Sequence, residues 1–359
     1  MYLYAIIPFF HFKKTTDFSM SDSTVVPYQL LQKKIYDRLV LAGIASEQAQ
    51  IEADIMTEAD LLGVPSHGVR MLPPLLKALA EGRVTKNPQF TAVRQFGAIA
   101  VLDCNNGPGR YASQKAMQQA ITLAQEFGVG VCLAKNTTHW GRAHAYANRA
   151  AQAGFIGICT TNAIPTMAIG GATKAVIGNN PLAIGIPGKI SDQPIVLDMA
   201  MSQAAVGKVG TWLREGKTLP DNWGLDAEGK PTNDAKAILG GAVLPMGEHK
   251  GAGLALMFEL LTAALAGTAF THQIRGHDPS GLDPQASKIF IALNPSAFID
   301  PAEFHQHSDA FIAYLKTEAA PFSYPGERGW QTRDKQLAGG VELHNEIVLQ
   351  LNSVGIYFN

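Results

Sequence analysis

Two histidines in this chain of 359 residues lie in loops where an imidazole could exchange protons with a ligand. His67 stands in the run Pro65-Ser66-His67-Gly68-Val69-Arg70, directly after the expected end of a helix. An imidazole titrates near pH ~6.5, which suits proton donation and removal near neutrality. Arg70 could hold a carboxylate in a bidentate grip. The alternative is that His67 caps the carbonyls of the preceding helix and Arg70 is a solvated charge.

The second histidine, His139, lies in the run Thr138-His139-Trp140-Gly141-Arg142, between an expected strand and an expected helix. Open α/β sheets place their ligand sites at the carboxyl ends of strands. A ligand-binding imidazole is therefore one interpretation. The other is that His139 caps the following helix while Trp140 packs beneath it.

Three further runs have the chemistry of a binding site without being specific for one. The turn Gly178-Asn179-Asn180-Pro181 exposes amides, although turn formation alone would also explain it. Asp198 ends a short apolar run, where a carboxylate either accepts hydrogen bonds from a ribose or amide or caps the next helix. The run from Gly247 to Gly251 precedes a long apolar helix, so His249 and Lys250 could hold a pyrophosphate or carboxylate at the helix start. Glu248 alternatively stabilises only that helix.

Several familiar motifs are absent. No Gly-x-Gly-x-x-Gly run occurs, so a conventional Rossmann fingerprint is excluded. Ser66 lacks the glycine two positions before it that a nucleophile elbow needs. His139 and His144 are five residues apart, whereas two zinc ligands on one helix face are four apart, and neither His-Glu-x-x-His nor Cys-x-x-Cys is present. We therefore expect no catalytic metal.

The charge of the chain restricts its partners. The 29 basic and 30 acidic residues give a net charge of −1, which provides no basic field for nucleic acid or an anionic membrane surface. Charged residues make up 16% of the chain, well below the ~25% of typical soluble domains. Either a partner subunit buries much of the surface, or the protein is poorly solvated.

Cysteine usage and the N-terminus indicate the compartment. Cys104, Cys132 and Cys159 are widely spaced and odd in number, so we expect buried free thiols and a reducing cytoplasm. The apolar start, residues 1–12, has its lysines after it and is too short to span a bilayer, which is wrong for a secretory signal or a membrane anchor. We expect residues 1–27 to be a disordered or artefactual extension, or else an arm that docks on another subunit.

The N-terminal part of the chain is predicted to be helical, and the part after residue 90 is predicted to contain both strands and helices. Apolar spacing predicts helices over 28–42, 46–62 and 72–81. From residue 90 onward, short apolar runs alternate with amphipathic helices, which favours an α/β layer with mixed or parallel strand pairing. The predicted strands are 98–102, 129–134, 155–160, 182–186, 194–197 and 289–293, and the predicted helices are 112–127, 143–152, 204–214, 251–266 and 301–316.

Two details follow from this pattern. Helix 251–266 is almost wholly apolar, so we expect it to be buried, and residues 216–235 should form an irregular excursion. We expect an α/β domain over 90–299 and a helical domain built from both chain ends, 28–89 and about 300–359.

Taken together, the runs around Ser66, His139, Asn179, Asp198 and His249, and the turn Tyr324-Pro325-Gly326-Glu327, resemble the type-2 malate/lactate dehydrogenase family. The resemblance covers about residues 28–350, with all six runs in family order. It implies an α/β enzyme with a non-Rossmann, three-layer, mixed-sheet fold that uses NAD or NADP. It also implies a homodimer with the active site between its domains.

The resemblance assigns roles to individual residues. His67 is implied as the acid/base with Ser66 beside it, and His139 as a neighbour of the nicotinamide or substrate. Arg70 and Arg142 are the candidate substrate cations. The residues implied at the cofactor or its pocket are Asn162, Asn179, Asn180, Pro181, Asp198, Met199, Ala200, His249, Lys250, Pro325 and Gly326.

Two positions depart from the family pattern. Met71 stands where many members carry an arginine that holds the substrate carboxylate, and Ser323 stands where an arginine often precedes the Pro-Gly turn. The carboxylate anchor and the choice between NAD and NADP therefore stay open. The expected activity is reversible reduction of a small 2-oxo acid to the 2-hydroxy acid. The alternatives are a reductase of cyclic imine 2-carboxylates and a non-catalytic nucleotide-binding protein.

Overall fold

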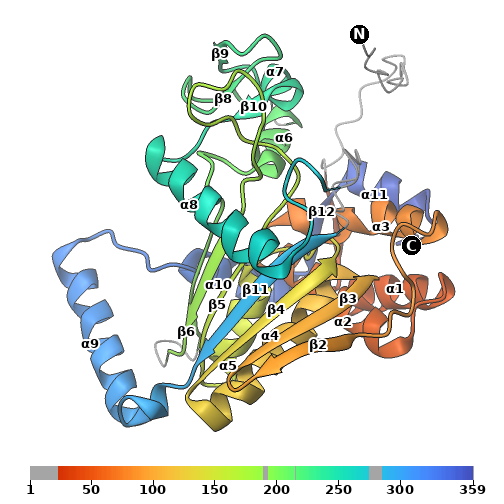
Figure 1. The fold of residues 1–359 in the computed structure, drawn as a ribbon. Coiled ribbons are helices and arrows are strands. Elements are labelled where there is room, and N and C mark those ends of the chain that lie inside the picture. The colour runs from red at the N-terminus through yellow and green to blue at the C-terminus, as the bar shows by residue number, and fades with distance from the viewer. Residues whose placement is uncertain (1–22, 189–192, 215, 275–284, 359) are drawn as a thin grey trace, which may run out of the picture.

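A seven-stranded mixed sheet forms the centre of the computed structural model, which describes residues 23–188, 193–214, 216–274 and 285–358 (Figure 1). β3 and β4 pair in parallel, and every other neighbouring pair is antiparallel. The expected mixed α/β fold is thus confirmed. In spatial order the strands are β2 (Thr91–Phe96), β3 (Ile99–Gly107), β4 (Val129–Thr137), β11 (Ala286–Leu293), β5 (Ile156–Thr161), β6 (Leu182–Ile186) and β7 (Ile195–Met199).

The centre of the sheet is strongly apolar. β11 lies between β4 and β5, and its Phe290 pairs with both Cys132 and Cys159. These two thiols and Cys104 are buried and free, which confirms the expectation of buried thiols. The sequence analysis missed β2, whose six residues are all exposed, because it has no apolar run that would mark a buried strand.

Two helices cover one face of the sheet, α4 (Gly109–Phe127) and α5 (His144–Gln152). The residue before α4 offers no capping side chain. Instead Glu52, on helix α2 (Ser46–Leu61), accepts the backbone N–H groups of Arg110 and Tyr111 at 2.8 and 3.0 Å. The Arg110 guanidinium also pairs with Glu52 at 3.1 Å, with both side chains 1% exposed. One buried carboxylate therefore caps α4 and binds it to α2.

The opposite face carries α8 (His249–Glu259), which continues into a π-helical turn over Leu260–Ala264 (Figure 1). Its inner side, Ala255, Phe258 and Ala263, is buried. The prediction that this helix is buried all round is wrong, because its outer side chains are exposed, Met257 by 48% and Leu265 by 62%. A single layer of helix covers the sheet here, and none of the described residues covers the outer side of the helix.

The two ends of the chain pack together beside the sheet. α1 (Tyr28–Leu41), α2 and α3 (Leu72–Ala80) share an apolar cluster with α11 (Asn345–Asn352), and β1 (Ser23–Val26) pairs with β12 (Val341–His344). Part of the expected extension therefore belongs to the fold, since β12 supplies its partner strand and Val26 is buried. Residues 1–22 lie outside the described residues.

Other C-terminal elements lie elsewhere. α9 (Pro301–Glu318) projects from the body with only Ile312 buried, and α10 (Glu327–Gly339) packs on α2 (Figure 1). The division into domains at residues 89/90 and about 300 stays a prediction.

A small lobe stands above the sheet in Figure 1. It contains α6 (Val206–Arg214), α7 (Ala235–Gly240) and a three-stranded sheet of β8 (Gly224–Leu225), β9 (Pro231–Thr232) and β10 (Ala242–Val243). The expected irregular excursion over 216–235 thus contains two very short strands, β8 and β9. No helix in the part of the chain that the structure describes is long and apolar enough to cross a membrane.

Removing the Glu52 carboxylate tests the link between α2 and α4. Glu52→Ala leaves the Arg110 cation buried without its carboxylate and uncaps α4, so the free energy of unfolding should fall by about 3–5 kcal/mol in urea denaturation. Glu47→Ala is the control, because Glu47 lies on the same helix and pairs with Lys115 at the surface. It should cost less than about 1 kcal/mol. Equal losses would contradict the account.

Candidate active site

A cavity of about 630 Å³ brings together side chains that are far apart in the sequence. Its walls come from the loop after α2, the loop between β4 and α5, the end of β7 and the side of α6. Nine predicted site residues line it: Ser66, His67, His139, Arg142, Asn179, Pro181, Asp198, Met199 and Ala200.

The two histidines form a stacked pair on the cavity wall. The rings of His67 and His139 lie 5.9 Å apart between centroids and are inclined by 18°. The Nδ1 atom of His67 is 2.8 Å from Ser66 Oγ, while His139 Nδ1 accepts the Gly141 N–H at 3.2 Å. Gly141 has a φ of +76°, which glycine adopts without strain, and so turns its N–H back toward the ring. The Nε2 atoms of both rings are therefore left for a ligand.

The surroundings of this pair hold both rings neutral. Burial lowers the pKa of His67 to about 3, and the nearby cations Arg142, Arg110 and Arg70 act in the same direction. Burial also lowers the pKa of His139 well below its usual value, assisted by Arg110, His67 and Lys288. In the ligand-free protein at neutral pH, His67 is thus a base, and a bound anion would favour its protonation.

A second cavity, of about 850 Å³, adjoins the first. Both cavities are lined by Arg142 and Asp198, which form an ion pair at 3.1 Å, with Asp198 inside β7 rather than capping a helix. The predicted residues Pro325 and Gly326 line the second cavity. The two hollows therefore form one extended site with the Arg142–Asp198 pair at the junction.

Two asparagines predicted at the cofactor site bind a buried carboxylate instead. Asn162 and Asn180 donate to the buried carboxylate of Glu259 at 3.3 and 3.0 Å, and Asn180 also accepts the Ala163 N–H at 3.1 Å. Neither is among the described residues that line the two cavities. Their side chains fasten α8 to the sheet behind the site.

Three predicted basic residues also lie outside the cavity walls. His249 and Lys250 begin α8 and are exposed, although Gly251 after them packs closely on the backbone of Met201, next to the first cavity. Arg70 is not among the described residues that line either cavity, and the charges of Arg214 and Glu346 act on it. The loop thus brings His67, but not Arg70, to the cavity.

Two cations that the sequence analysis missed do line the site. Lys208, on α6, lines the first cavity, with Nζ 5.4 and 5.1 Å from the centroids of the Trp212 and Trp223 rings. Arg328, in the first turn of α10, lines both cavities. Arg328 follows the Pro-Gly turn by two residues, a proximity that could have marked it.

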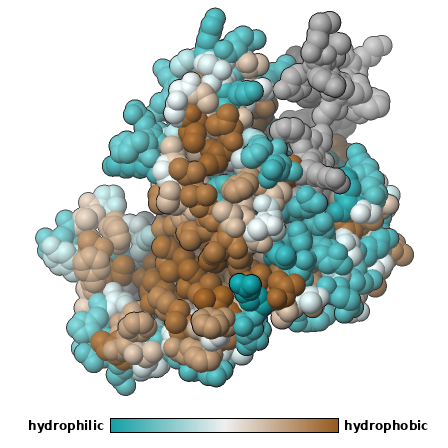
Figure 2. All heavy atoms as spheres, viewed as in Figure 1, coloured by the Kyte–Doolittle hydropathy of each residue, from teal (hydrophilic) through white to brown (hydrophobic). Residues whose placement is uncertain are grey.

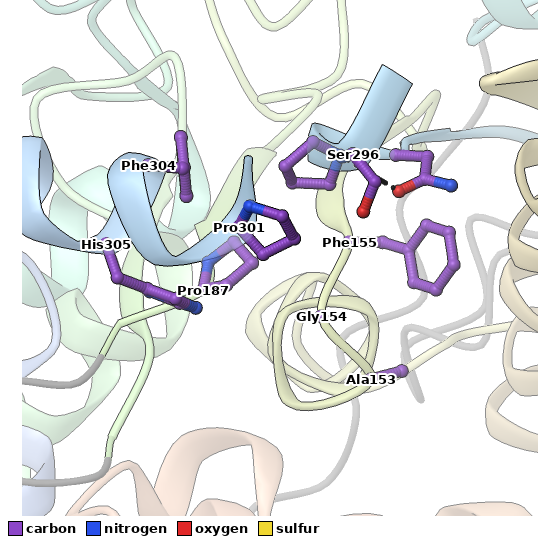
Figure 3. A pocket seen from close by; sticks show the side chains of 10 residues that line it. Ala153, Gly154, Phe155, Pro187, Ser296, Pro301, Phe304 and His305 are labelled. Carbon is purple, nitrogen blue, oxygen red and sulfur yellow. Dashed lines mark hydrogen bonds between the residues drawn. The ribbon is translucent and has the colours of Figure 1, made fainter. Parts of the chain in front are cut away.

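Another surface hollow has fewer side chains that could take part in a reaction. A hollow of about 320 Å³ between α5 and α9 is lined by prolines and phenylalanines, with His305 as the single titratable side chain among its described lining residues (Figure 3). Across the described part of the chain, no three His, Cys, Asp or Glu side chains gather as a metal site requires. The histidine cavity is therefore the candidate active site, and its chemistry is proton exchange with an anionic ligand.

Comparisons with known proteins define the class. Residues 26–352 match the sequence pattern of the malate/L-lactate dehydrogenase family. A malate dehydrogenase of Pyrococcus horikoshii is 32% identical over 92% of this chain and 94% of its own. A malate dehydrogenase structure from Entamoeba histolytica superposes with a TM-score of 0.87 at 28% identity, covering 94% and 99% of the two chains. These matches define an oxidoreductase of the dehydrogenase type.

The chain belongs to the malate/L-lactate dehydrogenase family, which confirms the resemblance found in the sequence. The expected NAD or NADP agrees with two relatives. Ureidoglycolate dehydrogenase (NAD(+)) of Escherichia coli is 30% identical over 92% of this chain and 95% of its own. (2R)-3-sulfolactate dehydrogenase (NADP(+)) of Chromohalobacter salexigens is 32% identical over 89% and 94%.

A further structural neighbour performs different chemistry. The Δ1-piperideine-2-carboxylate reductase of Pseudomonas syringae superposes with a TM-score of 0.84 at 29% identity, covering 92% of this chain and all of its own. The fold is therefore shared by proteins named for hydroxy acids and for a cyclic imine.

The low pKa of His67 can be tested directly. Its imidazole nitrogen signals should show a neutral ring from pH ~8 down to pH ~5 in the ligand-free protein, because the folded pKa is about 3. In urea the same ring should titrate near pH ~6.5. Nuclear magnetic resonance of nitrogen-15-labelled protein, with His67→Asn to assign the signals, provides the measurement. A midpoint between 6 and 7 in the folded protein would contradict this site geometry.

Proposed function

We propose that this protein is an NAD(P)-dependent dehydrogenase that reversibly reduces a small 2-oxo acid to the 2-hydroxy acid, with His67 as the acid/base. Family membership supports the reaction class. The observation that carries the residue assignment is the stacked His67–His139 pair on the wall of the cavity. Three cations line the same cavity: Arg142, Lys208 and Arg328. An imidazole with one nitrogen fixed and the other open to a ligand is the usual form of a general acid/base.

The proton step follows from the contacts of His67. In the tautomer whose Nδ1–H donates to Ser66 Oγ, Nε2 carries no hydrogen, so it takes the hydroxyl proton during oxidation and returns it to the carbonyl oxygen during reduction. His139 presents its own Nε2–H as a fixed donor, because its Nδ1 already accepts the Gly141 N–H. The hydride would come from, or pass to, a nicotinamide bound in the site.

The shape of the site fits a dinucleotide. An extended molecule needs a long cleft, and the two adjoining cavities, which share the Arg142–Asp198 pair, would provide one. Arg142 Nη1 is buried and has no hydrogen-bond partner among the described residues, so a polar group of a ligand would satisfy it. Met199, Ala200, Pro325 and Gly326 are the further residues that would hold the cofactor.

The substrate carboxylate needs a cation other than Arg70, which lies outside the cavity, and Met71 cannot supply one. Arg142 and Lys208 line the cavity beside His67 and are the proposed anchors. His249 and Lys250 stay proposed cofactor contacts at its rim.

Substrate profiling tests the reaction class. Malate, lactate, sulfolactate and ureidoglycolate, their 2-oxo acids, and cyclic imine 2-carboxylates would each be assayed by absorbance with both nicotinamide cofactors. Turnover of the oxo acids supports the proposal. Turnover of cyclic imines alone would favour the imine reductase that the Pseudomonas syringae structure suggests. Tight cofactor binding without turnover would favour a nucleotide-binding protein.

Replacing His67 tests its role. His67→Asn removes the titrating nitrogen while keeping a polar side chain of similar reach, so kcat should fall by about 10²- to 10⁴-fold. His307→Asn, at an exposed histidine on α9, is the control and should leave kcat unchanged. Near wild-type turnover in His67→Asn would exclude His67 as the acid/base.

The exposed apolar face of α8 supports the proposed homodimer. Figure 2 shows hydrophobic side chains spread over the middle of one face of the molecule. On α8 and the turn after it, six large apolar residues are more than a third exposed: Leu254, Leu256, Met257, Leu260, Leu261 and Leu265. A contiguous apolar surface of this kind is typical of a subunit interface, and it accounts for the 16% charged residues. The three buried thiols support a cytoplasmic location. The net charge of −1 supports an absence of nucleic acid and membrane partners.

A charge placed on this surface should dissociate the dimer. Leu261→Glu buries an unpaired carboxylate in the proposed interface, so sedimentation at micromolar concentration should change from dimer to monomer. Leu41→Glu, on α1 and away from α8, is the control because Leu41 is 79% exposed and outside the surface. A wild-type protein that sediments as a monomer would overturn the dimer.

A further inference from the structure

A buried carboxylate lies directly behind the loop that carries His67. Asp60 stands in the last turn of α2 and is 3% exposed. Its Oδ2 accepts the Val69 N–H at 2.7 Å, and its Oδ1 has no hydrogen-bond partner among the described residues. Asp60 thus holds the loop from the side opposite the cavity.

The fit between this carboxylate and the loop is tight. A Cβ atom on Gly68 would lie 2.0 Å from Asp60 Oδ1 and 2.4 Å from Oδ2. Only glycine can therefore follow His67 while the carboxylate keeps its place. On the other side of the loop, Gly207 of α6 approaches so closely that its Cβ would lie 2.9 Å from Ser66 Cβ. The Ser66–His67 pair is held between α2 and α6.

Few other bonds fix this loop. Residues 65–71 form two 3₁₀ turns, whose backbone hydrogen bonds include His67 N–H to Val64 O at 3.1 Å and Gly68 N–H to Pro65 O at 3.4 Å. Across the described residues, the bond from Val69 to Asp60 is the one hydrogen bond between the backbone of this loop and a side chain. That bond, together with the burial of Val69, holds the backbone two residues after His67.

The stability of the fold does not favour a carboxylate here. Burial raises the pKa of Asp60 to about 7, with the Val69 N–H and the charge of Arg110 opposing this. The end of a helix is also an unfavourable place for a negative charge. The carboxyl group therefore contributes here as the acceptor of the Val69 N–H rather than as a charge.

We propose that Asp60 is the positioning residue of the active site: its carboxyl oxygen holds the Val69 N–H and so fixes the Ser66–His67 pair toward the cavity. This inference rests on the proposed role of His67. Because a carboxyl oxygen accepts the N–H in both the ionised and the protonated form, the hydrogen bond acts across neutral pH. The acceptor, not the charge, does the positioning.

Two substitutions separate positioning from a merely structural role. Asp60→Asn keeps an oxygen acceptor of the same size, so kcat should stay within about threefold of wild type. Asp60→Ala releases Val69, and kcat should fall by about 10- to 100-fold, because small displacements of a catalytic group have effects of this size. Cofactor affinity, followed by fluorescence, should change by less than about threefold, and rates would be expressed per cofactor-binding site so that unfolded protein does not count.

A double-variant cycle tests the contact with Gly68. Gly68→Ala alone drives a methyl group into the carboxylate and should lower kcat as much as Asp60→Ala does. In the Asp60→Ala background the same methyl group has space, so the second substitution should add less than about threefold. Fully multiplicative losses would overturn the proposed contact.

The outcomes also separate this inference from the proposed function. If His67→Asn is inactive while Asp60→Ala turns over within threefold of wild type, the positioning role of Asp60 is wrong and the acid/base role of His67 stands. If Asp60→Asn loses as much activity as Asp60→Ala, an acceptor is not sufficient and the proposal is overturned. If His67→Asn keeps its activity, the acid/base assignment itself is wrong.

Discussion

The buried pair of Glu52 and Arg110 connects the two loops that carry the histidines of the site. The Glu52 carboxylate joins α2 to the start of α4, and the loop after α2 carries His67. The Arg110 guanidinium packs against Gly141, with Nε 3.0 Å from the position of a Cβ there, and so supports the loop that carries His139. Its charge lowers the pKa of both histidines. Since a buried ion pair contributes little net stability, this one is better explained by the geometry it fixes.

The candidate active site combines two neutral imidazoles, those of His67 and His139, with arginine cations beside them. Burial removes the charge from His67 and His139, whereas the arginine side chains beside them stay charged because guanidinium is too strong a base to lose its proton. Such a cavity attracts an anionic substrate, and the bound anion in turn favours the protonated imidazole that reduction needs. In this environment the His67 imidazole can thus act as a base toward the hydroxy acid and, once protonated, as an acid toward the oxo acid.

Local patterns predicted most elements of the fold and the loops that carry chemistry. The strand at residues 182–186 has the predicted bounds, and the runs around His67 and His139 meet as expected. Long-range packing determines the features that local patterns did not predict. Asn180 and Asn179 are adjacent in one turn, yet one binds Glu259 and the other lines the cavity, and no spacing distinguishes them. The outer face of α8 is exposed although its sequence is almost wholly apolar, because apolar composition does not distinguish an exposed helix face from a buried one. Asp60 carries no motif, since its importance lies in a contact across nine residues.

The role of His67 as a neutral base is tested by the pH dependence of kcat/KM for oxo acid reduction, because this quantity reports the protonation of the enzyme before the oxo acid binds. With a His67 pKa of about 3, only a small and pH-dependent fraction of the enzyme is protonated. The account predicts that kcat/KM falls tenfold per pH unit from pH ~5 to ~8, without a plateau, and that this slope is lost in His67→Asn. A plateau below pH ~6.5 in the wild-type enzyme would show an ordinary, solvated imidazole and contradict the account.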